Sequence, residues 1–240
     1  MGWQKIKNFI LDLIFPKECI GCGREGYYLC KSCREKIEIK KRFECALCHR
    51  ESNFGRICPG CQKNTSLKTI WVVADYNNKI LQSLIHGLKY QYLEEISTHL
   101  ANLVIKYLED YNIFKQFDIT NENSVVVGVP LHKKRLLSRG FNQSDLIAQE
   151  IAKYFKMPFV KLIDREKNTQ TQIGLDRQDR QRNVENAFSL SNNYSNYKNK
   201  KIILIDDVVT TGSTLTECAK ILQSAGLVDI YALVIAQRED

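Results

Sequence analysis

The 240-residue sequence lacks several features that would place it in a special class of protein. It has no run of the roughly 18 to 20 apolar residues that a membrane-spanning helix requires. It has only four prolines and 12 glycines, and 44% of its residues are hydrophobic, which argues against collagen-like, disordered and coiled-coil chains. Residues 3–15 mix Lys5, Lys7 and Asp12 with apolar side chains, and no small-residue cleavage site follows. We therefore expect no secretory signal and a cytoplasmic protein.

Residues 3–15 carry apolar side chains at the i, i+3, i+4, i+7 and i+8 positions of an amphipathic helix, and Pro16 would end that helix. We interpret it as a helix that packs on its own protein. The alternative is a helix that lies on a membrane surface. The apolar positions are Ile6, Phe9, Ile10, Leu13 and Ile14.

Cysteine is concentrated in the first quarter of the chain. Eight of the nine cysteines form four CxxC pairs, which in a reducing compartment are metal ligands far more often than disulfides. The spacing predicts two structural Zn²⁺ sites, each tetrahedral and all-cysteine. We favour sequential sites because short loops close each one locally; an interleaved pairing is the alternative. The predicted ligand sets are Cys19, Cys22, Cys30 and Cys33, and Cys45, Cys48, Cys58 and Cys61.

The composition divides the chain into two parts. Residues 1–66 have few long apolar runs, so this segment needs metal to fold, whereas residues 67–240 have the pattern of an α/β domain. The first part holds 13 of the 35 basic residues and 7 of the 27 acidic ones. Eight thiolates on two Zn²⁺ ions would cancel most of this local excess. The net charge of +8 is therefore weak evidence for nucleic-acid binding.

From residue 69 onward, apolar strand-like runs alternate with helical periodicity. This alternation predicts right-handed βαβ units and a mostly parallel, doubly wound sheet. Residues 112–124, 169–186 and 191–200 are polar and are expected to be loops. Strands are expected over 69–76, 125–130, 159–163, 201–207 and 230–236, and helices over 80–90, 93–111, 144–155 and 213–225.

The sharpest motif is I-I-L-I-D-D-V-V-T-T-G-S-T, residues 202–214. Asp206 and Asp207 come at the expected carboxyl end of a strand, which is where ligands bind in open parallel sheets. The following small hydroxyl residues open directly into a helix, and such a helix start forms a phosphate cradle. No Gly-Lys-Ser/Thr ends the loop and no G-x-G-x-x-G is present, so it is neither a Walker A loop nor a dinucleotide fingerprint.

This motif resembles the phosphoribosyl pyrophosphate (PRPP) signature of type I phosphoribosyltransferases. The resemblance implies that fold: a parallel sheet with flanking helices, here preceded by a small double zinc-ribbon-like module. It implies that Asp206 and Asp207 are the catalytic acid pair, which binds the ribose hydroxyls, stabilises the cationic sugar and accepts a proton. It also implies a Mg²⁺ ion that accompanies PRPP. The loop implied to wrap the 5′-phosphate comprises Val208, Val209, Thr210, Thr211, Gly212, Ser213 and Thr214.

A second segment, residues 129–148, resembles the ComF family, which includes the gluconate-utilisation relative GntX. The resemblance extends to the cysteine pairs, to Lys89-Tyr90, to the R-G-F-N-Q segment starting at Arg139, and to a Q-x2-L-x4-R-x2-N-V pattern over 172–184. The strand before the R-G-F-N-Q segment often reads V-P-V-P-L in this family, whereas residues 127–131 of this chain read V-G-V-P-L. Gly128 therefore departs from the family pattern.

The ComF resemblance implies a pyrophosphate loop made by Val129, Pro130 and Leu131. Lys133, Lys134, Arg135 and Arg139 would be its counter-charges; for Lys133 and Lys134 the alternative is a solvated basic helix start. The resemblance also implies a lid over residues 165–183 in which Arg177 and Arg180 reach phosphates, although such a polar stretch is often only a loop.

Three functions remain open at this stage. The first is a ComF-like protein of DNA uptake and natural transformation that binds PRPP and uses its zinc module to dock single-stranded DNA or partners. The partners that the resemblance implies are a ComFA-type helicase and a DprA-type mediator. The second is a metabolic phosphoribosyltransferase, whose acceptor base the sequence does not reveal. The third is a PRPP-sensing regulator without turnover.

The remaining candidates are structural or weak. Cys218 and Trp71 are expected in the core, and His49 is an alternative zinc ligand. A DNA-docking module would use the basic residues between the second and third cysteine pairs, with a few aromatic rings for base stacking. The basic residues are Lys31, Arg34, Lys36, Lys40, Lys41 and Arg42, and the aromatic ones are Tyr27, Tyr28, Phe43 and Phe54.

Overall fold

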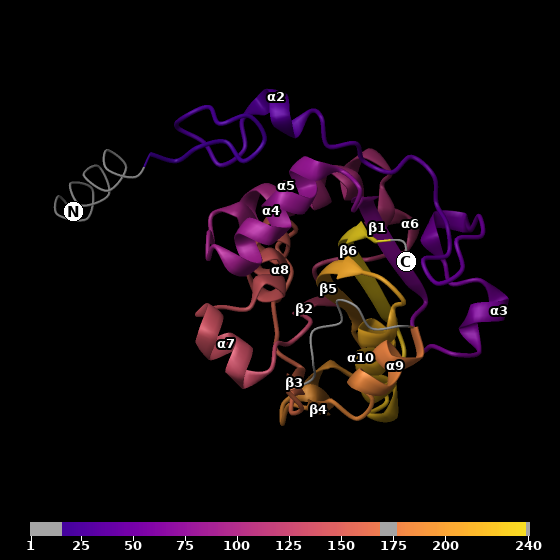
Figure 1. Ribbon diagram of the computed structural model, residues 1–240. Helices are drawn as coiled ribbons and strands as arrows, with labels where there is room; N and C mark the ends of the chain where they lie inside the picture. The colour runs from indigo at the N-terminus through magenta and orange to yellow at the C-terminus, as the bar shows by residue number, and fades with distance from the viewer. Residues whose placement is uncertain (1–15, 169–176, 239–240) are drawn as a thin grey trace.

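The centre of the molecule is a four-stranded parallel sheet. The structure is a computed structural model that describes residues 16–168 and 177–238. The strands are β1 (Thr69–Asp75), β2 (Ser124–Gly128), β5 (Lys201–Val209) and β6 (Ile230–Gln237), in the order β1-β6-β5-β2 (Figure 1). All three pairings are parallel, as the alternation of strands and helices predicts.

The side chains of this sheet alternate between two separate cores, as the period of two in a strand requires. Ile203 and Leu233 face a core built with the helices α4 (Lys79–Tyr90), α5 (Ile96–Asp110) and α8 (Gln143–Tyr154), whereas Leu204 and Val234 face a core built with α10 (Ser213–Ser224). The continuous apolar runs in the sequence therefore reflect strands that are buried on both faces. Trp71 and Cys218 are fully buried, as expected.

Helices cover both faces of the sheet (Figure 1). The longer ones match the periodicity of the sequence to within about three residues at each end. Within the described residues, the α-helices are α2 (Lys31–Arg34), α3 (Pro59–Gln62), α4 (Lys79–Tyr90), α5 (Ile96–Asp110), α6 (Ile113–Gln116), α7 (Lys133–Arg139), α8 (Gln143–Tyr154), α9 (Arg177–Val184) and α10 (Ser213–Ser224). Two 3₁₀ helices, η1 (Asn53–Gly55) and η2 (Tyr194–Tyr197), lie in connections.

Several sequence expectations are wrong in detail. The strand expected over 159–163 is a single bridge between Phe159 and Val126, after which β3 (Ile163–Arg165) pairs antiparallel with β4 (Phe188–Leu190). The expected loops over 112–124 and 169–186 contain the helices α6 and α9. Strand β5 extends two residues beyond the expected end at Asp207, to Val209, and contains the acid pair as expected.

The eight paired cysteines lie in two small modules joined by one connection. The first cysteine module (residues 17–36) lies over α4 and α5, and the second cysteine module (residues 43–62) lies beside β1 and carries α3 (Figure 1). Each begins with one antiparallel bridge around its first CxxC turn, Glu18 to Glu25 and Glu44 to Glu51. The helix predicted over 3–15 lies outside the described residues.

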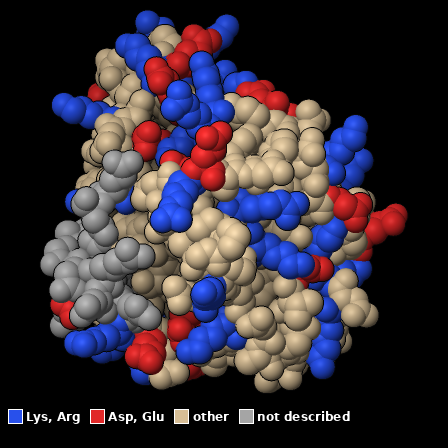
Figure 2. Space-filling model, turned by 90° about the vertical axis from the view of Figure 1, so that its right-hand side faces the viewer, with Lys and Arg blue, Asp and Glu red and all other residues tan. Residues whose placement is uncertain are grey.

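The surface carries charges of both signs. On the side of the molecule that bears α3, lysine and arginine side chains are interspersed with aspartate and glutamate and do not form one continuous basic face (Figure 2). Among the described residues, no helix is both long enough and apolar enough to cross a membrane.

Candidate functional site

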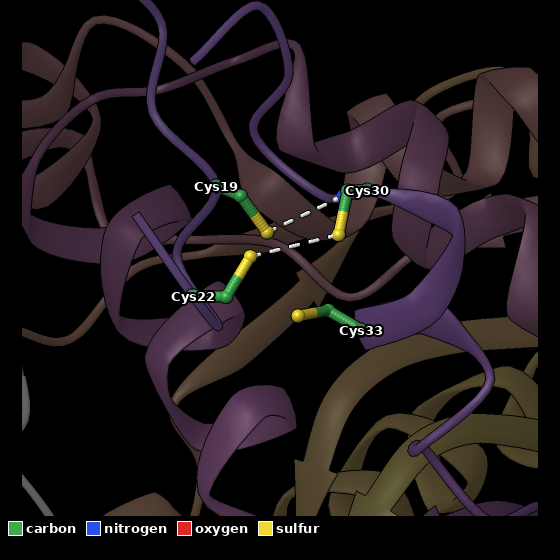
Figure 3. Close-up of side chains that lie close together, drawn as sticks. All are labelled: Cys19, Cys22, Cys30 and Cys33. Carbon is green, nitrogen blue, oxygen red and sulfur yellow. Dashed lines mark hydrogen bonds between the residues drawn. The ribbon is translucent and has the colours of Figure 1, made fainter. Parts of the chain in front are cut away.

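Each cysteine module gathers four sulfur atoms around one point. Within each set, all ligand atoms lie within 4.8 Å of one another. A tetrahedral zinc with Zn–S bonds of about 2.3 Å separates its sulfurs by about 3.8 Å. The Sγ–Sγ distances of 3.7 Å between Cys22 and Cys30 (Figure 3) and of 3.5 Å between Cys48 and Cys58 match this value.

The chain therefore has two four-cysteine zinc-binding sites, and the sequential pairing is confirmed. His49 and Cys218 belong to neither set. The two sets are Cys19, Cys22, Cys30 and Cys33, and Cys45, Cys48, Cys58 and Cys61.

Local hydrogen bonds prepare the first cysteine module for a metal. The backbone N–H of Cys30 donates to Cys19 Sγ at 3.3 Å, and Ser32 Oγ lies 3.2 Å from Cys30 Sγ (Figure 3 shows the cysteines). The Ser32 hydroxyl is the largest influence that lowers the pKa of Cys30, to about 6. Since zinc binds the thiolate, these contacts favour the form of cysteine that a metal requires.

A second candidate site is a cavity of about 300 Å³ at the carboxyl end of the sheet. It lies where β5 and β2 end side by side, which is the usual place for a ligand in a parallel sheet. The acid pair of the sequence motif opens into it. Its lining comprises Tyr76, Ile85, His86, Lys89, Tyr90, Val129, Pro130, Leu131, Arg135, Arg139, Gln143, Arg165, Asp206, Asp207, Val208, Thr210, Thr214 and Arg238.

Asp206 is held from two sides. Its Oδ1 accepts a hydrogen bond from Ser144 Oγ at 3.0 Å and another from the backbone N–H of Asp207 at 2.9 Å. Burial, followed by the neighbouring Asp207 carboxylate, raises the pKa of Asp206 to about 7. Asp206 is therefore the carboxyl group of this cavity that is suited to exchange a proton near neutral pH.

Asp207 forms a buried ion pair. Its Oδ1 lies 2.7 Å from Lys89 Nζ, and the Asp207 side chain is only 5% exposed. Burial is the largest single influence and lowers the pKa of Lys89, but the charge and hydrogen bond of Asp207, together with the neighbouring Asp206 and Tyr90, give a net rise. Asp207 Oδ2 is buried and has no hydrogen-bond partner among the described residues. An oxygen in this condition is suited to a ligand that donates a hydroxyl or supplies a cation.

The small hydroxyl residues form a tight loop at the start of α10. Thr211 Oγ1 lies 2.7 Å from Ser213 Oγ, and the Ser213 backbone N–H points to the same Thr211 oxygen at 3.4 Å. Gly212 precedes the helix in the left-handed region, with φ of 76°, which a side chain would disfavour. The loop thus presents hydroxyls and helix N-terminal amides together, which is a suitable arrangement for an anion.

The loop after β2 forms hydrogen bonds to β5 and to the residue that precedes α8. The Val129 N–H donates to the Ile205 carbonyl at 2.9 Å, and the Val129 carbonyl accepts from Asn142 Nδ2 at 3.0 Å. Gly128 is required just before it, because a Cβ there would overlap with Asp145 Oδ1 and lie 2.8 Å from the Asp145 nitrogen. Close approach of α8 to β2 therefore explains why this chain has glycine at position 128.

Most of the candidate residues share the cavity, but some do not line it. Lys133 is exposed at the start of α7, and Arg135, two residues further along, lines the cavity in its place. Val209 is buried in the core. Arg165, expected to begin a lid, ends β3 and is 9% exposed. The predicted residues that line the cavity are Val129, Pro130, Leu131, Arg139, Asp206, Asp207, Val208, Thr210 and Thr214; Thr211, Gly212 and Ser213 complete the loop beside it.

Two family models match this chain. The model described as "Phosphoribosyl transferase domain" matches residues 93–240, which is more than half of the chain, and the one described as "Double zinc ribbon domain" matches residues 10–62. The first covers the acid pair and its loop, and the second covers all eight paired cysteines, from Cys19 to Cys61. These matches agree with the fold class that the sequence predicts.

Three relatives resemble the chain over most of its length. It is 31% identical to "Competence protein F" of Haemophilus influenzae over 231 residues, covering 93% of this chain and 98% of that protein. The chain belongs to the ComF family. It is also 31% identical to "DNA utilization protein YhgH" of Escherichia coli (85% and 96% covered) and 27% identical to "Competence protein ComFC" of Bacillus subtilis (82% and 79% covered).

In this ComF-family chain, the sequence reasoning missed three residues of the site. Lys89 pairs with Asp207, Ser144 donates to Asp206, and Asn142 holds the loop after β2. The signal was present, because Lys89 lies in the Lys89-Tyr90 match and Asn142 lies in the R-G-F-N-Q segment. What was missing was the spatial partner of each residue.

The lid predicted by the ComF resemblance is only partly described. Residues 169–176 and the side chains of Arg177 and Arg180 lie outside the described residues. The described parts are residues 165–168, which follow from the end of β3, and α9, which packs beside α10.

Proposed function

We propose that this chain binds PRPP together with Mg²⁺ in the cavity at the end of β5 and β2. The observation that carries the proposal is Asp207, which lines the same cavity as a hydroxyl-rich loop and whose buried Oδ2 has no hydrogen-bond partner among the described residues. A ribose phosphate has hydroxyls that Asp207 can accept hydrogen bonds from and a phosphate that the hydroxyl-rich loop can hold. Two adjacent carboxylates also suit Mg²⁺, which binds few protein groups and keeps substrate phosphates as ligands.

The residues divide the proposed ligand between them. Asp206 and Asp207 would accept hydrogen bonds from the ribose hydroxyls, with Lys89 holding Oδ1 of Asp207 in place. The α10 loop would hold the 5′-phosphate, and the loop after β2 with Arg139 would hold the pyrophosphate. When bound, Mg²⁺ would neutralise the pyrophosphate charge and so make it a better leaving group.

Isothermal titration calorimetry with PRPP, with and without Mg²⁺, tests this proposal. We expect Mg²⁺-dependent binding that falls at least about tenfold in Asp206→Asn, because an amide offers one acceptor oxygen in place of two and cannot take a negative charge when Mg²⁺ binds. Asp110→Asn, an exposed position on α5, is the matched control and should bind normally. Equal affinity in Asp206→Asn and the parent protein would remove the acid pair from the proposed site.

Turnover is a second candidate function. The rings of Tyr76, His86 and Tyr90 line the same cavity as the acid pair, which gives a planar nitrogenous acceptor a wall to pack on. In the reaction, the acceptor nitrogen forms a bond to ribose C1 while the C1–O bond to pyrophosphate breaks. Pyrophosphate release that requires an added nucleobase would support transfer. Tight PRPP binding without release would support a sensor.

We further propose that the chain serves DNA uptake in natural transformation, as the names of its relatives suggest. The first cysteine module and the segment after it would dock single-stranded DNA or a partner protein, a ComFA-type helicase or a DprA-type mediator. Their exposed basic residues support this role; Lys40 does not, because Glu44 and Asp75 hold its ammonium at 2.6 and 3.7 Å. The exposed ones are Lys31, Arg34, Lys36, Lys41 and Arg42.

The aromatic rings expected to stack bases differ in exposure. Phe43 and Phe54 pack on each other, with ring centroids 5.0 Å apart, and both lie against the core. Tyr28 is also partly buried, whereas Tyr27 is 58% exposed. We therefore expect DNA binding at this module to be mainly electrostatic.

The division of labour proposed here follows the two parts of the sequence. Residues 1–66 would form the docking module and residues 67–240 the PRPP-binding domain. Cysteines that bind zinc and do not form disulfides are typical of a reducing compartment, which supports a cytoplasmic location. Surface plasmon resonance with purified ComFA-type and DprA-type proteins tests the docking role, and absence of binding to either would leave DNA as its ligand.

A further inference from the structure

The second cysteine module touches the hydroxyl-rich loop directly. The side chain of Leu47, in the turn between Cys45 and Cys48, lies against the backbone of Gly212. The contact is so close that a Cβ placed on Gly212 would overlap with Leu47 Cδ2. Gly212 is the residue that ends the loop and begins α10. The cysteine turn therefore forms part of the wall that shapes this loop.

Two further contacts fasten the same module around the start of α10. The carbonyl of Ala46 accepts a hydrogen bond from Gln237 Nε2 at 2.8 Å, and Gln237 is buried beside Val209 in the sheet register. Just after the module, Thr65 Oγ1 accepts from Thr216 Oγ1 at 3.2 Å. Thr216 lies in the first turn of α10.

The position of Leu47 depends on the cysteine turn that carries it. The N–H groups of Cys48 and His49 both donate to the Cys45 carbonyl, at 3.2 and 2.8 Å, which closes a tight turn with Leu47 on it. Cys45 and Cys48 also share one four-sulfur set. A metal on that set would hold both ends of the turn and would therefore fix the place of Leu47.

We propose that Leu47 is a positioning residue for the phosphate-binding loop, through which the second zinc site supports ligand affinity. The identity of the ligand rests on the proposed function above. Leu47 keeps Gly212 and the first turn of α10 in the conformation that presents the loop amides and hydroxyls. It touches no ligand itself, so its effect is restricted to the part of the ligand that this loop holds.

The chain offers a matched control for this role. Leu190, at the end of β4, is also a half-buried leucine that packs against the same core as Leu47. It has no place in the loop or in either cysteine module. Leu190→Ala therefore reproduces the general cost of trimming a half-buried leucine. Leu47→Met is the conservative variant that keeps an apolar side chain of similar volume.

The first measurement compares two probes by titration calorimetry on the full chain. Leu47→Ala should weaken ribose 5-phosphate binding about tenfold and leave pyrophosphate binding unchanged, because only the former uses the α10 loop. Leu47→Met should restore binding, Leu190→Ala should leave it unchanged, and every variant should keep two zinc ions. Unchanged ribose 5-phosphate affinity in Leu47→Ala, or an equal loss for both probes, would overturn the proposal.

The second measurement needs no ligand. Amide hydrogen exchange in Thr210–Thr214 should be faster in Leu47→Ala than in the parent protein, and unaltered in Leu190→Ala. Faster exchange in a protein that binds no ribose 5-phosphate would support the positioning role while refuting the proposed ligand. Unaltered exchange in Leu47→Ala would refute the positioning role, whatever the parent protein binds.

Discussion

The two cysteine modules have the same ligand chemistry but different neighbours. In the first module, Gly21 lies close to Cys33 and to Ile80 of α4, and the side chain of Ile20 lies close to Gly87 of α4. In the second module, Leu47 lies on Gly212 in the phosphate loop. The first is thus attached to a helix that ends near the cavity, while the second forms part of the cavity's own framework. The metal site alone therefore does not reveal the role of a zinc ribbon. That role depends on the element against which the ribbon packs.

The largest expected difference between the modules comes from removing one zinc ligand from each. Cys48→Ser and Cys22→Ser should each lose about one zinc per chain, measured by metal analysis. Cys48→Ser should also weaken ribose 5-phosphate binding about a hundredfold, because its module frames the loop and folds only with metal. Cys22→Ser should weaken it no more than about threefold. Equal losses would mean that both modules act only through overall stability.

The second test concerns the ion pair between Lys89 and Asp207. Lys89 belongs to α4, the helix on which the first module packs. Lys89→Met should lower the free energy of unfolding by about 2 kcal/mol, because it leaves a buried carboxylate without its partner. Adding Asp207→Asn should recover about half of that loss. Lys106→Met, which breaks the exposed pair with Asp110, is the control and should change stability by less than about 0.5 kcal/mol. Denaturant unfolding measures all of these, and a Lys89 effect as small as the Lys106 one would contradict the pair.

The third test separates the two acids, because α4 holds Asp207 while α8 holds Asp206. The pKa of Asp206, raised to about 7 mainly by burial, exceeds its ordinary value, so the folded chain holds a proton that the unfolded chain releases between about pH 4 and 7. The stability due to this group is therefore present below about pH 4 and is lost as the pH rises through 7.

Relative to Asp206→Asn, the parent protein should lose about 1–2 kcal/mol of unfolding free energy between pH 4.5 and 8, after allowance for solvent screening. The amide oxygen of asparagine can still accept from Ser144, so the hydrogen bond is retained. Urea unfolding at each pH gives the difference. If the unfolding free energies of the two proteins changed equally with pH, the pKa of Asp206 would not be raised in the folded chain.

The smallest expected effect concerns nucleic acid. If the first module and its following segment bind single-stranded DNA through about four to five phosphates, log K should fall against log salt with a slope of about −3. Lys31→Gln with Arg34→Gln should make the slope less steep by about 1.4, since each lost contact removes about 0.7. Arg50→Gln with Lys63→Gln, exposed positions at the second module, should leave it unchanged. The same slope change in both pairs would remove the distinction between the modules for DNA.

The failures of the sequence prediction have a common physical origin. Helix α9 has almost no apolar stripe, with Val184 as its one buried residue among those described, so periodicity could not reveal it. Helix α6 has only four residues, too few for a period to show. The strand expected near Phe159 leaves the sheet after two hydrogen bonds with Val126, at 2.9 and 3.0 Å. Apolar runs indicate burial, but strand pairing depends on neighbours that come from elsewhere in the chain.

The sequence by itself determined what is local. The sequential zinc sets follow from short loops that bring each pair of CxxC turns together, and the buried strands follow from continuous apolar runs. The acid pair and its hydroxyl loop are adjacent in the chain, so their placement at the end of β5 was predictable from residues 202–214 alone.

Only the tertiary structure decided what joins distant segments. Lys89 meets Asp207, Ser144 meets Asp206, and Leu47 meets Gly212, although the partners in each case lie far apart in the sequence. Such contacts depend on how helices and modules pack on the sheet, and no local period or spacing encodes that packing. The pKa of Asp206 and the difference between the two cysteine modules both arise at this level, because burial and neighbouring charge are properties of the packed chain.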